Sequence, residues 1–177
     1  IAVIEDAASA RFLRGELLYQ LTALKNLFSY SGVSLVLEGD GPTVDGEQLA
    51  SIDTGLLLLL GVEKGDSEHE ARELCRKILT YRVFPDETGR MNRSLLDIGG
   101  SLLVVSQFTL AADTSSGTRP GFSLAAGPDA ANTLYERFVV EARSGLGPEK
   151  VGEGRFGADM KVGLVNDGPV TFMLETR

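Results

Sequence analysis

The chain has 177 residues, 43% hydrophobic and 24% charged, a composition typical of a single globular domain with its own core. A single cysteine, Cys75, and a single histidine, His69, exclude an internal disulfide and a cysteine cluster for zinc. The net charge of −8 argues against broad nucleic-acid binding, which depends on cationic contacts with phosphates, but it is compatible with recognition of a nucleic-acid end. The longest apolar run, over residues 56–62, is too short to span a bilayer, and we expect neither a signal peptide nor membrane association.

The first half of the chain predicts three strands and one helix. Residues 1–4 read as a short strand, and apolar residues recur at helical spacing over 13–28. A second strand is predicted over 33–37, followed by a hairpin signal at Asp45-Gly46. Residues 56–62 are apolar on both faces, which is typical of a buried strand.

The second half begins with a capping-box pattern over residues 67–70, which opens a helix with Cys75 on its apolar stripe. A buried strand is predicted over 102–110. Pro128 stands at a plausible first position of the last helix, and Gly145 is the expected C-cap.

Two strands with alternating apolar residues, over 160–164 and 170–174, end the chain. The two strand–helix units predict right-handed crossovers and a partly parallel sheet, with antiparallel additions at both ends. The predicted fold is therefore α/β: one domain over residues 1–177, with a mixed β-sheet and helices packed on one side.

The first candidate site is Ser106-Gln107-Phe108-Thr109. It places two hydroxyls and an amide at the end of an apolar run, where a rigid strand can hold a site. If the strand ends there, free backbone N–H groups become available to stabilise an oxyanion. The pattern equally fits a strand with polar residues on its wet face.

Two later segments are further candidates. Asn166-Asp167-Gly168-Pro169 is either a hairpin turn or a functional loop, because all four are standard turn residues. Phe156 and Met160 stand four residues apart and could clasp a flat ring, or they could belong to the core.

We expect no metal and no cofactor. A G-x-G-x-x-G string over residues 152–157 precedes a strand instead of joining a strand to a helix, so it is not read as a dinucleotide site. His69 lies at a charged helix start and Cys75 on an apolar stripe, so any hydrolytic mechanism must operate without the usual protein base.

Several long segments, in the same order, resemble the D-aminoacyl-tRNA deacylase family, also called D-Tyr-tRNA deacylases. The resemblance covers about residues 44–175. It rests on the motifs Ser106-Gln107-Phe108-Thr109 and Asn166-Asp167-Gly168-Pro169, with Gly154-Arg155-Phe156-Gly157-Ala158-Asp159-Met160 before the second. The resemblance implies a barrel-like sheet of the deacylase type.

The family resemblance also implies an activity, which is hydrolysis of the ester between a D-amino acid and the terminal ribose of tRNA. The Phe108 N–H would face the developing oxyanion. Ser106, Gln107 and Thr109 would frame the catalytic site. The substrate's own ribose hydroxyl would act in place of a protein base. The partners implied are the tRNA acceptor end carrying a D-amino acid and a second copy of the chain, in a cytoplasmic homodimer with active sites at the subunit interface.

Substrate selection is implied to come from the later segments. Gly168 and Pro169, joined by a cis bond, would enter the neighbouring subunit's site and leave no room for an L side chain. Glycine has no side chain to exclude, so glycyl-tRNA would also fit. Phe156 and Met160 would hold the terminal adenine, and Asn166 belongs to the same substrate-binding set.

This sequence departs from the family pattern in three places. Ile4-Glu5-Asp6-Ala7 stands where the family continues into Gln-Arg-Val, whose arginine supports the Gly-Pro loop. Residues 11–40 have no counterpart and are interpreted as an insertion that contains a helix. Gly121 replaces a usual serine.

Two alternatives follow from these observations. The departures and the acidic charge fit a binding module for nucleic acid or protein that keeps the fold but has reduced or absent deacylase activity. A generic esterase with Ser106 or Thr109 as nucleophile is disfavoured by the isolated His69.

Overall fold

The computed structural model describes residues 2–5, 29–37, 47–164, 166 and 169–176. The predicted helix over 13–28, the Asp45-Gly46 hairpin signal and Gly168 lie outside the described residues.

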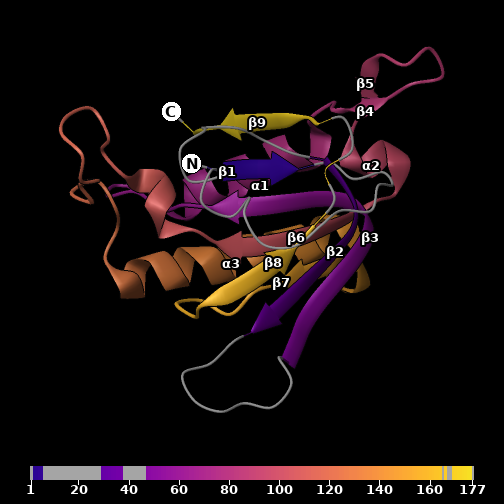
Figure 1. The fold of residues 1–177 in the computed structure, drawn as a ribbon. Helices are drawn as coiled ribbons and strands as arrows, with labels where there is room; N and C mark the ends of the chain where they lie inside the picture. The colour runs from indigo at the N-terminus through magenta and orange to yellow at the C-terminus, as the bar shows by residue number, and fades with distance from the viewer. Residues whose placement is uncertain (1, 6–28, 38–46, 165, 167–168, 177) are drawn as a thin grey trace.

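The elements alternate between strands and helices in the order predicted for a mixed α/β fold (Figure 1). The strands are β1 (Ala2–Glu5), β2 (Ser29–Leu37), β3 (Glu47–Leu60), β4 (Phe84–Pro85), β5 (Met91–Arg93), β6 (Ser101–Ser106), β7 (Val151–Glu153), β8 (Met160–Gly163) and β9 (Thr171–Leu174). The helices are α1 (Glu68–Thr80), α2 (Leu95–Ile98) and α3 (Pro128–Leu146), with short 3-10 turns η2 (Phe108–Ala111) and η3 (Pro148–Lys150).

One side of the main sheet is a parallel ribbon of β3, β6 and β7, with β7 at its edge. Strand β3 pairs with β6 so that Leu60 lies beside Ser106, and β6 pairs with β7 so that Val104 lies beside Glu153. Helices α1 and α3 make the two crossovers, as the predicted strand–helix units require. The carboxyl ends of all three strands therefore meet at one edge of the sheet, which we call the site edge.

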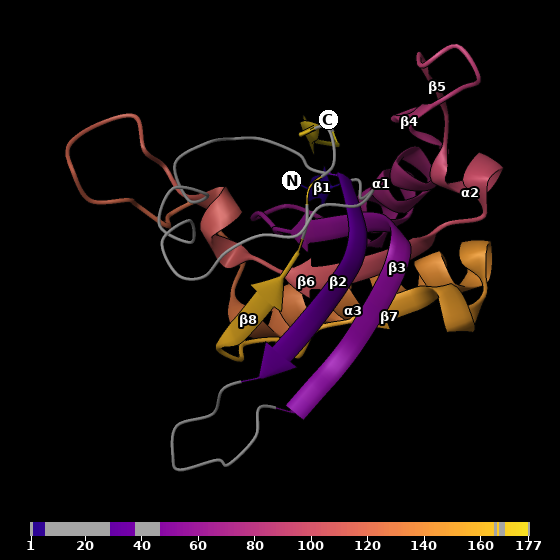
Figure 2. The same ribbon diagram turned by 45° about the vertical axis from the view of Figure 1, so that its right-hand side comes forward.

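Antiparallel strands extend this ribbon. Strand β1 lies between β3 and β9 and is antiparallel to both. The long strand β3 pairs with β2 over residues 47–56 and with β1 over residues 57–60, and β2 in turn pairs with β8 (Figure 2). The strand predicted over 33–37 is confirmed and begins earlier, at Ser29. The pairings of the described residues form an open path, so the barrel-like closure stays a prediction.

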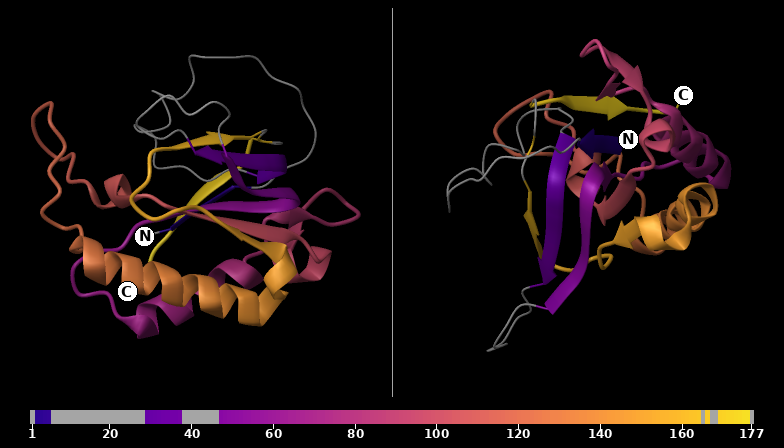
Figure 3. Two further views of the ribbon diagram at one scale, coloured as in Figure 1. Left: turned by 90° about the horizontal axis from the view of Figure 1, so that it is seen from below. Right: turned by 90° about the vertical axis from the view of Figure 1, so that its right-hand side faces the viewer.

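Helices α1 and α3 lie in one layer against one face of the sheet, which confirms the predicted arrangement (Figure 3). Their buried residues, including Ile78 and Phe138, pack with Leu56, Leu58 and Leu102 of the sheet. We call this group of buried residues the helix-side core. A second apolar cluster is formed by Ile52, Leu57, Leu103 and Val105 and is called the far-side cluster.

The helix ends follow from local chemistry. The Ser67 side chain accepts a hydrogen bond from the His69 N–H, and the reciprocal capping box with Glu70 forms as predicted. Helix α3 begins at Pro128 as predicted, but its C-cap is Gly147, so the expected cap at Gly145 is wrong. A Cβ at Gly145 would lie 2.6 Å from Leu79 Cδ1, so this glycine is explained by close packing between the two helices.

None of the helices among the described residues is long and apolar enough to cross a membrane.

Candidate active site

Strand β6 ends at Ser106, earlier than the strand predicted over 102–110. The Gln107 N–H still donates to Leu60 O at 2.8 Å, but β3 itself ends at Leu60 and offers no further pairing. The chain then turns into η2, closed by the Leu110 N–H donating to Gln107 O at 3.2 Å. The prediction is therefore wrong beyond Ser106, because the neighbouring strand is too short to continue the ladder.

This early strand end leaves backbone donors at the site edge. The first N–H groups of a helical turn have no acceptor within the turn. Among the described residues, no acceptor is found for the N–H of Phe108 or of Thr109. The Thr109 hydroxyl accepts a hydrogen bond from Gln107 Nε2 at 2.5 Å, which ties the two side chains together across the turn. The segment can thus present N–H groups to a negatively charged oxygen.

The segment that follows β7 reaches the same edge. The Gly154 N–H donates to Val104 O at 2.8 Å, which continues the parallel register one residue beyond β7. Phe156 therefore follows β7 in the direction in which Gln107 follows β6. Ligands of sheets with parallel strands bind beyond the carboxyl ends of those strands, so both segments occupy a favoured position.

Phe156 and Met160 pack against different parts of the core. The Phe156 ring packs against the helix-side core, and its centroid lies 6.0 Å from that of Tyr135. Met160 packs against the far-side cluster. The structure thus does not place the two side chains in one cluster, and the adenine clasp stays a prediction.

The site edge also carries uncovered apolar side chains that the sequence pattern did not single out. Phe108 is 61% exposed and Phe122 39% exposed, and their ring centroids are 5.0 Å apart. Leu124 is 52% exposed, although the Lys64 N–H donates to its carbonyl oxygen at 2.8 Å and fixes the backbone there. Isolated exposed apolar residues are common, but an aromatic pair at a strand end is a candidate contact surface.

The Asn166–Pro169 segment connects strands that do not pair with each other among the described residues. Strand β8 pairs with β2 and strand β9 with β1, so the alternative of a simple hairpin turn is wrong. Asn166 Oδ1 accepts a hydrogen bond from the Val170 N–H at 3.3 Å and so spans the segment that contains Pro169. Pro169 itself is exposed.

The sheet register places Pro169 and Phe108 beyond opposite ends of the main sheet. Thr171 lies at the level of Leu103, and Leu174 lies at the level of Ser106. These two levels are three residues apart, or about 10 Å along a strand. Pro169 precedes Thr171 and Phe108 follows Ser106, so both lie further out, in opposite directions. The described part of the chain does not bring the two segments together.

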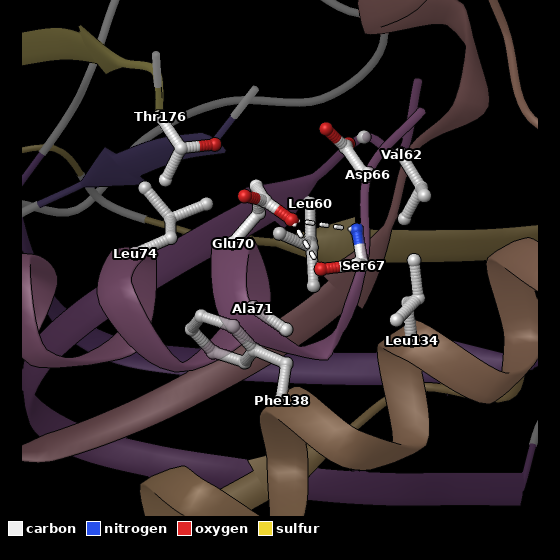
Figure 4. A pocket seen from close by; sticks show the side chains of 11 residues that line it. Leu60, Val62, Asp66, Ser67, Glu70, Ala71, Leu74, Leu134, Phe138 and Thr176 are labelled. Atoms are coloured by element: carbon white, nitrogen blue, oxygen red, sulfur yellow. Dashed lines mark hydrogen bonds between the residues drawn. The ribbon is translucent and has the colours of Figure 1, made fainter. Parts of the chain in front are cut away.

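A pocket lies between the end of β3 and helices α1 and α3 (Figure 4). Its walls include Leu60, Leu134 and Phe138. Its polar lining residues are Asp66, Ser67, Glu70 and Thr176. Glu70 accepts a hydrogen bond from the Ser67 N–H at 2.8 Å as part of the capping box. The pocket includes none of the predicted site residues, and we assign it no ligand.

Comparison with known proteins identifies the family of the chain. The family model of D-Tyr-tRNA(Tyr) deacylase matches residues 41–175. The chain belongs to the D-Tyr-tRNA(Tyr) deacylase family. The match includes every predicted site residue, whereas the interpreted insertion over 11–40 lies outside it.

Individual relatives agree with the family match. A D-aminoacyl-tRNA deacylase of Marinobacter nauticus is 71% identical over 133 residues, which cover 75% of this chain and 85% of that protein. A protein of the same name from Shewanella sp. is 59% identical over 133 residues, covering 75% of this chain and 90% of the relative. The solved structure of a c-Myc DNA Unwinding Element Binding Protein aligns with a TM-score of 0.77 and 33% identity, covering 99% of this chain and 98% of the other.

Hydrolases often use a histidine as the base or a cysteine as the nucleophile, but His69 and Cys75 of this chain are not suited to these roles. The His69 side chain is 79% exposed on α1, with Nε2 4.0 Å from the Glu73 carboxylate. Burial raises the pKa of the Cys75 thiol to about 12, so it stays protonated and unreactive near neutral pH. The described residues contain no group of three or more His, Cys, Asp or Glu side chains placed to hold a metal ion.

Proposed function

We propose that this protein hydrolyses D-aminoacyl-tRNA to free D-amino acid and tRNA, and so removes D-amino acids from charged tRNA. The observation that carries the proposal is the 71% identity with a protein named D-aminoacyl-tRNA deacylase. The strand end at Ser106, with its available N–H groups, supports it because ester hydrolysis passes through an oxyanion. The alternative of a binding module without activity is not favoured, because the 59% identical relative carries the same name.

In the proposed reaction the substrate's ester carbonyl oxygen lies against the Phe108 N–H. Water adds to the carbonyl carbon, and the N–H stabilises the negative charge that develops on the oxygen. The bond between that carbon and the ribose oxygen then breaks, and the ribose oxygen takes up a proton. The adjacent ribose hydroxyl carries the proton from the attacking water, because neither His69 nor Cys75 is placed to do so.

A covalent mechanism through Thr109 ranks second. A threonine nucleophile needs a neighbouring base that removes its proton. Among the described residues, the hydrogen-bond partner of the Thr109 hydroxyl is Gln107 Nε2, which donates a hydrogen bond and cannot take up a proton. We therefore assign Ser106, Gln107 and Thr109 to shaping the site around the Phe108 N–H.

The proposed active site is shared between two subunits. Pro169 and Phe108 lie beyond opposite ends of the sheet, which supports an arrangement in which Pro169 approaches the active site of a second copy of the chain. The exposed rings of Phe108 and Phe122 offer an apolar surface for such a contact. In this arrangement the Gly168-Pro169 backbone excludes an L side chain and admits D-amino acids and glycine.

The partner is a charged tRNA, bound through its acceptor end in the cytoplasm, where aminoacyl-tRNA is used. The net charge of −8 limits favourable phosphate contacts to a small local area. Phe156 is the candidate for contact with the terminal adenine, since it follows β7 at the site edge. Met160 and Asn166 remain in the proposed substrate-binding set, with Asn166 also bracing the Pro169 segment.

The activity is tested with D-tyrosyl-tRNA, L-tyrosyl-tRNA and glycyl-tRNA under identical conditions. We expect release of D-tyrosine and glycine while the L-ester is spared. Equal cleavage of the D- and L-esters would refute the proposed chiral selection. Absence of turnover at stoichiometric enzyme would instead support the binding-module alternative.

The shared site is tested by mixing two inactive variants, Pro169→Ala and Phe108→Pro. If each site combines Phe108 of one subunit with Pro169 of the other, a mixed dimer contains one intact site and recovers activity. If both residues serve the same subunit, mixing recovers nothing.

A further inference from the structure

Tyr135 combines deep burial with a polar group that reaches the site edge. It lies on α3, which packs against the sheet, and only 3% of its surface is exposed. Its neighbours among the buried residues of α3 are apolar, including Phe138 and Val139, so a hydroxyl is unusual there. A buried hydroxyl is costly unless it forms hydrogen bonds, so its partners identify its role.

The Tyr135 hydroxyl bridges two separate segments. It lies 2.9 Å from Val104 O in β6 and 3.1 Å from Gly154 O directly after β7. The single proton of the hydroxyl is shared between the two carbonyl oxygens. The two segments are also joined directly, because the Gly154 N–H donates to Val104 O at 2.8 Å. Burial raises the pKa of Tyr135, so the hydroxyl remains a proton donor across the physiological range. The contact holds the start of the Gly154–Met160 segment against the strand that ends on Ser106.

The ring of Tyr135 supports the same segment two residues later. The Tyr135 and Phe156 centroids are 6.0 Å apart, and the ring planes meet at 52°. Aromatic pairs at this separation are favourable and restrict ring orientation. One side chain thus fixes both the backbone at Gly154 and the ring at Phe156, while its own burial leaves it no direct access to a substrate.

We propose that Tyr135 is a positioning residue that holds Phe156 at the site edge and thereby sets the affinity for the adenosine end of the substrate. This inference rests on the proposed function. It predicts that losing the hydroxyl weakens substrate binding and leaves the chemical step unchanged, because the Phe108 N–H belongs to a different segment.

The test is Tyr135→Phe, which removes only the hydroxyl oxygen. Two quantities are measured: kcat and KM with D-tyrosyl-tRNA, and the Kd of a D-tyrosyl-adenosine analogue in which an amide replaces the ester. We expect KM and Kd to rise by about threefold to tenfold, the effect of one net hydrogen bond, with kcat within about twofold of wild type.

Two controls separate positioning from general destabilisation. Tyr81→Phe removes the same atom from a ring that contacts Phe172 at 5.6 Å, and it should leave KM unchanged. Val139→Ala truncates a buried residue of the same helix, so it should lower the Tm with no change in KM. An equal rise in KM for Val139→Ala would show that the effect of Tyr135 is merely structural and would overturn the proposal.

A double-mutant cycle tests whether Tyr135 acts through Phe156. Phe156→Leu alone should raise Kd, and adding Tyr135→Phe should raise it no further. Additive effects, or a Phe156→Leu protein with wild-type Kd, would overturn the proposed role. If wild type cleaves D-tyrosyl-tRNA but Tyr135→Phe matches it, only the positioning role fails. If wild type neither cleaves nor binds the analogue, the proposed function fails and this inference fails with it.

Discussion

The replacement Phe108→Pro deletes the backbone donor that the proposed mechanism uses. Phe108 is the first residue of η2, a position where proline is favoured because that N–H has no partner within the turn. The preceding residue, Gln107, has φ −140° and ψ 84°, which lies outside the α region that a following proline disfavours. The variant should therefore fold.

The expected magnitude follows from the hydrogen bonds around Phe108. Its N–H has no acceptor among the described residues, so deleting it breaks no hydrogen bond of the turn, and the Gln107 N–H bond to Leu60 O at 2.8 Å is preserved. Loss of one oxyanion donor typically costs about 10²–10³ in kcat, or about 2.7–4 kcal/mol of transition-state stabilisation. We expect a loss of this size with little change in the free energy of unfolding.

The matched control is Phe108→Ala, because both variants lose the exposed ring but only proline loses the N–H. Single-turnover hydrolysis of D-tyrosyl-tRNA measures the chemical step, and urea denaturation measures stability. A Phe108→Pro protein that is folded and hydrolyses as fast as Phe108→Ala would refute the assignment of this N–H to the oxyanion. Equal, large losses in both variants would show that the ring, not the N–H, carries the effect.

Three further predictions concern the fold and the chemistry. Gly55→Ala should lower the free energy of unfolding by about 1–3 kcal/mol or more in urea denaturation, since its Cβ would lie 1.8 Å from Ser101 O; an unchanged value would contradict the close approach of the two strands. Above pH 9.0 the unfolded thiol of Cys75 ionises while the folded thiol, with its pKa near 12, stays neutral, so stability is lost as pH rises. Relative to Cys75→Ala, the free energy of unfolding should therefore fall by about 1.4 kcal/mol per pH unit between pH 9.0 and about 12, and parallel pH profiles would count against this burial. Thr109→Ala should lower kcat by less than about tenfold, the scale of its hydrogen bond with Gln107, whereas loss of a true nucleophile costs on the order of 10⁶.

The sequence predicts those parts of the fold that depend on local chemistry. The capping box at Ser67, the proline start of α3 and the two parallel crossovers are confirmed, because each follows from nearby residue types or from chain handedness. The end of β6 is not predictable in the same way. The predicted strand runs through Leu110, but the ladder stops where β3 stops, and that limit belongs to a strand 46 residues earlier.

The candidate site is also only partly predictable from the sequence. The resemblance brings Ser106–Thr109, Phe156 and Pro169 into one site. In the structure, the first two segments follow the neighbouring parallel strands β6 and β7 toward the site edge. The position of Pro169 at the other end depends on the register of β9 against β1, which apolar alternation alone does not specify. The role of Tyr135 cannot be predicted from the sequence pattern either, because its hydrogen-bond partners Val104 and Gly154 are distant in sequence.

The parallel ribbon of β3, β6 and β7 has a consequence for how the protein acquires its activity during folding. Leu57 pairs with Leu103 and Val104 with Glu153, so each contact that builds the site edge closes a long stretch of chain. Such nonlocal contacts form slowly, because the entropy of loop closure is lost before the pairing is gained. A partly folded chain with both helices formed would therefore still lack the strand end that exposes the Phe108 N–H. Recovery of hydrolysis after dilution from denaturant should lag behind recovery of helical circular dichroism, and it would report directly on the docking of the last parallel strand.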